Sequence, residues 1–109
     1  MEGKRIERRN LNEDPVRVME DYAHVKNAAY LASKKVIEEV SAQYSLEEKH
    51  RITLDECVQE KIIASTATTT PELRAVAIEE VERLIGAYDL DRRIAKTFSE
   101  KFDLAMKVY

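Results

Sequence analysis

The two histidines of the chain each follow a carboxylate by three residues, a spacing found in some helical metal sites. Asp21 precedes His24, and Glu47 precedes His50, so each pair shares one face if its segment is helical. Di-metal sites in helical bundles use such pairs, but they also take single glutamates from two further helices. An acidic residue at position 47 is also favoured by the dipole of a helix that begins nearby. The four residues are metal candidates by spacing alone, and we expect no bound metal and no cofactor.

His24 also allows a signalling interpretation, because histidine phosphotransfer domains are four-helix domains with an exposed histidine on a long helix. The segment from Tyr22 to Lys26 resembles the motif around the phosphorylated histidine of that family. The family has lysine three residues after the histidine and then glycine, whereas here Lys26 is two residues on and Asn27 follows. The resemblance is confined to these residues, and it implies a phosphoryl group carried on His24.

A basic segment near the N-terminus offers a route to nucleic acid, because such side chains can follow a phosphate backbone. Its residues are Lys4, Arg5, Arg8 and Arg9. Carboxylates at positions 2, 7, 13 and 14 balance this charge. A helix-turn-helix interpretation of residues 54–84 would use an acidic recognition helix, which phosphate repels. A nucleic-acid-associated regulator is therefore an alternative function, and nucleic acid is not the expected partner.

Other catalytic patterns are missing from the sequence. It has no glycine-rich phosphate loop, no His-Glu-x-x-His segment, and no serine or cysteine nucleophile beside a recognisable base. Cys57 is the only cysteine, which excludes an intrachain disulfide and a thiolate metal cluster. We expect a buried, inert thiol there and a protein that is not an enzyme.

Composition indicates a globular protein inside the cell. Apolar residues make up 44% and charged residues 36%, and the formal net charge of −3 is spread along interleaved acids and bases. No apolar run approaches the roughly 20 residues of a membrane-spanning helix, and no apolar signal region follows the first charged residues. We therefore predict a cytoplasmic protein without a membrane partner.

Helix signals divide the chain into four segments. With only two glycines and two prolines, the turns that β-hairpins need are scarce. Asp14-Pro15 and Thr70-Pro71 each place a capping side chain before a proline, and Ser45 with Glu48 forms a capping-box pattern. We predict an all-α antiparallel bundle of helices at 15–44, 46–64, 71–87 and 90–108. Residues 1–13 form a flexible polar arm, and residues 14–109 form one domain.

Three local details are left open or rest on single residues. A second capping pattern at Thr53 to Glu56 allows the second helix to restart near Leu54. Gly86 is a possible signal for the end of the third helix. Either Asp89 or Asp91 could cap the fourth helix.

The first and last helices carry more apolar surface than one four-helix core needs. The fourth helix carries a stripe with spacings of three and four, from Leu90 to Tyr109. This stripe either completes the core or forms an interface with a partner. We predict a non-catalytic protein interaction or regulatory module that self-associates and could bind a second protein. Its interface candidates are Met19, Tyr30, Ile37, Tyr44, Phe98, Phe102, Leu104, Met106 and Tyr109.

Overall fold

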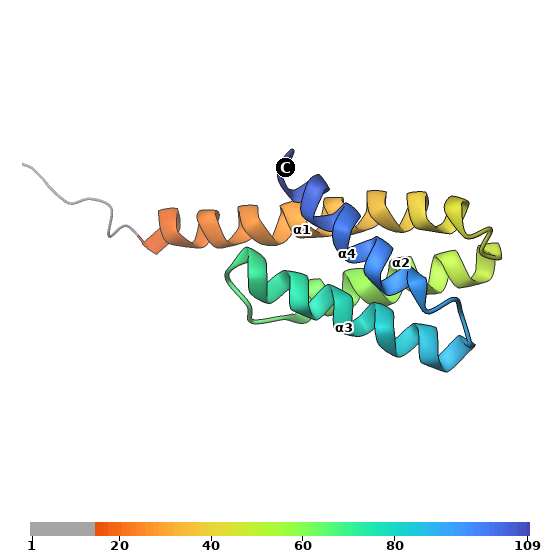
Figure 1. Cartoon of the computed structure of the whole chain (residues 1–109). Coiled ribbons are helices and arrows are strands. Elements are labelled where there is room, and N and C mark those ends of the chain that lie inside the picture. Colours follow the sequence, from red (N-terminus) through yellow and green to blue (C-terminus); the bar gives the residue numbers. More distant parts are fainter. Residues whose placement is uncertain (1–14) are drawn as a thin grey trace, which may run out of the picture.

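The computed structural model describes the backbone of residues 15–109 and the side chains of residues 23–109. This part of the chain holds four α-helices and no strand: α1 (Pro15–Gln43), α2 (Glu48–Ala64), α3 (Thr70–Tyr88) and α4 (Arg93–Met106). Figure 1 shows α2 turning back along α1 and α3 turning back along α2, while α4 crosses obliquely beside α1. The prediction of an all-α helical bundle is confirmed.

The core lies between the inner faces of all four helices, because each helix repeats apolar residues at steps of three and four. Within α1 the inner positions alternate with exposed ones, so that Val36, Ile37 and Val40 are buried while their charged neighbours are exposed. The buried apolar cluster consists of Ala29, Ala32, Val36, Ile37, Val40, Leu54, Val58, Ile62, Leu73, Ala77, Val81, Leu84, Ile85, Ile94, Phe98 and Phe102.

The junction of α1 and α2 differs from the prediction. Ser45 adopts a left-handed conformation, with φ of 53°, and the Leu46 amide donates to the Ser41 carbonyl at 2.9 Å. This is the hydrogen bond by which a left-handed residue closes a helix C-terminus. Ser45 therefore ends α1, so it does not cap α2. Glu47 takes the N-cap position without a side-chain hydrogen bond, and the predicted capping box at Ser45 is wrong.

The second helix is continuous, which decides the alternative left open at Leu54. Thr53 lies inside α2, and its hydroxyl donates to the Lys49 carbonyl at 2.8 Å. Helical Thr side chains satisfy themselves in this way, so Thr53 does not cap a new helix.

The start of α3 lies one residue earlier than predicted. Thr69, rather than Thr70, is the N-cap, and its hydroxyl accepts the Glu72 amide. The Glu72 carboxylate in turn accepts the Thr69 hydroxyl at 2.9 Å and the Thr68 amide at 3.2 Å. The run of threonines provides the reciprocal cap, while Pro71 lies in the first turn, where its missing N–H costs nothing.

The junction of α3 and α4 also corrects one prediction. The third helix continues through Gly86 and ends where Asp89 takes a left-handed conformation, with φ of 54°. The Leu90 amide donates to the Ile85 carbonyl at 2.9 Å, so Asp89 closes α3 in the way Ser45 closes α1. Asp91, the other candidate cap, accepts the Arg93 amide at 2.9 Å. Gly86 is therefore not the end signal of α3.

Candidate functional site

The two histidines lie on different helices. His24 is exposed on α1, whereas Glu47 and His50 lie at the start of α2, with the His50 ring 5.4 Å from that of Tyr88. The side chain of Asp21 lies outside the described residues. Among the side chains described, no group of three or more His, Cys, Asp or Glu is placed to hold a metal ion. The phosphotransfer interpretation of His24 stays a prediction.

Two other predictions fall outside the described side chains. The basic segment of Lys4, Arg5, Arg8 and Arg9 precedes the first described residue, and the side chain of Met19 lies in the undescribed part of α1. Cys57 is half-buried on α2, beside the core. This is more exposure than the buried thiol that the sequence predicts.

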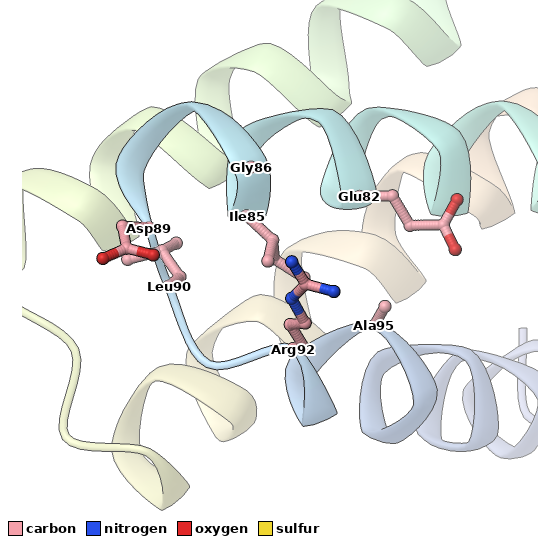
Figure 2. A pocket seen from close by; sticks show the side chains of 7 residues that line it. All are labelled: Glu82, Ile85, Gly86, Asp89, Leu90, Arg92 and Ala95. Carbon is pink, nitrogen blue, oxygen red and sulfur yellow. The ribbon is translucent and has the colours of Figure 1, made fainter.

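A hollow of about 360 Å³ lies at the corner between α3 and α4. Ile85, Gly86 and Leu90 form part of its wall, and Figure 2 shows the Arg92 guanidinium reaching toward α3 between the carboxylates of Glu82 and Asp89. Within the described chain, Arg92 makes no ion pair with either acid. The hollow has charges of both signs around an open mouth, which favours no single ligand.

Three of the interface candidates lie in the core instead of on a surface. Ile37, Phe98 and Phe102 are almost completely buried, and the two phenylalanine rings stack with centroids 5.7 Å apart. This is the alternative in which the stripe of α4 completes the core. Burial removes these three side chains from the surface of the folded chain, so they are not available to an interface.

Tyr44 connects the end of α1 to the start of α4. Its hydroxyl shares a 2.7 Å hydrogen bond with the Thr97 hydroxyl, and the Arg93 guanidinium lies 5.6 Å from the centre of its ring. Arg93 is itself held by hydrogen bonds to Asp91. These hydrogen bonds lower the pKa of the Asp91 carboxyl to about 2. These contacts give Tyr44 a structural role that fixes where α4 crosses α1.

Apolar side chains remain exposed where the last turns of α4 lie beside α1. Leu104 is 63% exposed, Val108 79% and Tyr109 43%, and Met106 is half-buried. A groove of about 240 Å³ runs beside Leu104 and Val108, and we call it the α1–α4 groove. It is lined by Lys35, Val36, Glu39, Lys101, Leu104, Ala105 and Val108. The core already contains the aromatic residues of α4. The apolar side chains at the rim of the groove lie outside that core.

The outer face of α1 borders this groove and is strongly charged. Lys34, Lys35, Glu38 and Glu39 are exposed there, with Leu31 one turn earlier. Glu39 pairs with Lys101 of α4 at 3.6 Å, whereas Lys34, Lys35 and Glu38 have no ion pair within 4 Å in the described chain. Burial raises the pKa of Asp55 on α2, and the positive charge of Lys34 opposes this rise. Lys34 therefore lies close to α2.

Two features of the structure were missed from the sequence: the charged face of α1 and the contacts of Lys26 at the other end of the bundle. The charged pattern of α1 is visible as Lys-Lys-Val-Ile-Glu-Glu, but its meaning depends on knowing that the two central residues point inward. Tyr30, an interface candidate, is half-buried and lines a separate shallow hollow with Lys26 and Ile63. The Lys26 ammonium closes that end of the bundle by donating to the carbonyls of Ile63 and Ser65, at 3.1 and 2.7 Å.

No protein family, curated protein or solved structure matches the chain. No helix in the described part of the chain has the length and apolar character needed to cross a membrane.

Proposed function

We propose that the chain is a non-catalytic helical interaction module that associates with a second copy of itself. The surface used is the α1–α4 groove together with the exposed outer face of α1. This function is regulatory or assembly-related and is exercised in the cytoplasm, with a second protein as a further possible partner of the assembled form.

The observation that carries the proposal is the exposure of Leu104 in the last turn of α4 and of Val108 two residues beyond its end. Both side chains line one groove, whose opposite wall is α1. Apolar side chains scattered singly over a surface need no explanation. Apolar side chains that lie together beside a groove provide an apolar surface. Removing that surface from water favours association by about 25 cal/mol per Å².

The proposal is tested by measuring molecular mass by sedimentation and light scattering over a wide range of protein concentration. We expect a monomer–dimer equilibrium in which Leu104→Lys raises the dissociation constant at least tenfold. Ile63→Lys is the matched control, because Ile63 is 58% exposed but lies at the end of α2, away from the groove. A strict monomer at every concentration would overturn the proposal, as would equal effects of the two substitutions.

A further inference from the structure

The exposed residues of α1 form a pattern that is complementary to its own reverse. Between positions 31 and 42 the outer face carries Leu31, Lys34, Lys35, Glu38, Glu39 and Ala42. The intervening residues at 32, 33, 36, 37, 40 and 41 are buried. The outer pattern therefore has its centre between Val36 and Ile37, with lysines on one side of that centre and glutamates on the other.

An antiparallel second copy of α1 would meet this face with opposite charges. If two helices pack about a two-fold axis at the centre of the pattern, Lys35 lies opposite Glu38 of the second copy near the middle of the face. Lys34 and Glu39 of one copy lie at the two edges of the contact, level with Glu39 and Lys34 of the other. The same register places Leu31 opposite Ala42. A parallel arrangement would instead bring lysine against lysine and glutamate against glutamate, which is repulsive. An isologous contact repeats each of these pairs twice.

The structure leaves the two central charges available. Lys35 and Glu38 are exposed and have no ion pair within 4 Å in the described chain, although lysine and glutamate three or four residues apart can pair along a helix. Glu39 is held at the edge of the groove by Lys101. The charges of α1 are thus displayed at fixed positions beside the apolar rim of Leu104 and Val108.

We infer that α1 packs antiparallel against α1 of a second copy, about a two-fold axis between Val36 and Ile37, with the rims of the two α1–α4 grooves flanking the contact. This arrangement rests on the proposed function and adds its register and orientation. The apolar rim provides the area that is buried, and the charges choose the antiparallel register over its alternatives.

Charge reversal at one complementary pair tests the arrangement. In Lys35→Glu the two copies oppose glutamate with glutamate at both symmetric positions, and in Glu38→Lys they oppose lysine with lysine. We expect each variant alone to dimerise at least tenfold more weakly at low salt. An equimolar mixture of the two should form a heterodimer of nearly wild-type affinity. The double variant K35E/E38K should also recover the homodimer, because its pattern is again self-complementary.

Lys49→Glu is the matched control for net charge, because Lys49 is an exposed residue of α2 whose charge change equals that of Lys35→Glu. It should leave the dissociation constant unchanged. Circular dichroism establishes that every variant is folded.

The outcomes separate this inference from the proposed function. A dimer that is weakened by Leu104→Lys but unaffected by either charge reversal would overturn the antiparallel α1 arrangement and leave self-association standing. Weakening by both reversals without recovery in the mixture or the double variant would also overturn it. A wild-type chain that stays monomeric would overturn both.

Discussion

Truncation of Phe102 tests which side of α4 belongs to the core and which side is exposed. Phe102 is fully buried, and its ring stacks on that of Phe98 at 5.7 Å. Replacing a buried phenylalanine with alanine costs about 3–5 kcal/mol through lost burial and the cavity left behind. A stacked aromatic partner contributes about 0.5–1.5 kcal/mol of such a loss. Because a domain of this size is stable by about 5–15 kcal/mol, Phe102→Ala should remove a large fraction of the free energy of unfolding.

The comparison variant is Leu104→Ala, two residues further along the same helix. Leu104 is 63% exposed, so its truncation should change the free energy of unfolding of the monomer by at most about 0.5 kcal/mol. Urea denaturation followed by circular dichroism at low protein concentration measures both values. At higher concentration the Leu104→Ala difference should grow, because dimerisation stabilises only the folded wild-type chain. Equal losses for the two variants at low concentration would refute this placement of α4.

Three further predictions concern the cap of α3, the buried carboxylate of Glu80 and the glycine of α3. Thr69→Ala should destabilise the fold by about 1 kcal/mol, and NMR titration should show the lowered pKa of Glu72 moving back up, because the Thr69 hydroxyl is the main cause of its shift. Glu80 is buried and its pKa is lowered by hydrogen bonds from Arg83, so the wild type should exceed Glu80→Gln in stability above about pH 4.5. This difference in the free energy of unfolding should be lost as pH falls through the lowered pKa of Glu80. Urea denaturation at pH 7 and at acidic pH measures it, and a difference that stayed constant would contradict the prediction. Gly86→Ala should stabilise the fold by up to about 0.5–1 kcal/mol, because Gly86 is helical in the last turn of α3 and a Cβ there meets nothing within 4 Å. A loss of thermal stability would count against it.

The helices themselves could be predicted because their signals are local. Apolar spacing, the prolines and the scarcity of glycine located each segment to within a few residues. The ends were harder, because Ser45 and Asp89 both terminate helices in left-handed conformations. Neither is the glycine that usually marks such a position. In both cases the next residue, Leu46 or Leu90, packs partly against the core, so the helix ends depend on tertiary contacts absent from the local sequence.

The candidate surface could be predicted only in part. The sequence indicated an excess of apolar residues on the first and last helices, but it could not divide them between core and surface. Phe98 and Phe102 face inward with Ile94, whereas Leu104 lies on the opposite side of the same helix. Glu80 is one of the acids that make the third helix acidic in sequence, and no local pattern shows that it is only 4% exposed. Its Arg83 partner, three residues on, satisfies both carboxylate oxygens.

This division of residues also bears on how strong any self-association can be. Because the aromatic residues of α4 and the larger aliphatic residues of α1 fill a core within one chain, folding does not require a second copy to cover them. The apolar area left for a partner is small and centres on Leu104 and Val108, while exposed ion pairs contribute only about 0.2–1 kcal/mol each. We therefore expect a reversible dimer with a dissociation constant on the order of micromolar or weaker, whose orientation is set by Lys35 and Glu38. In such an assembly small changes in salt or concentration would shift the population between the two states.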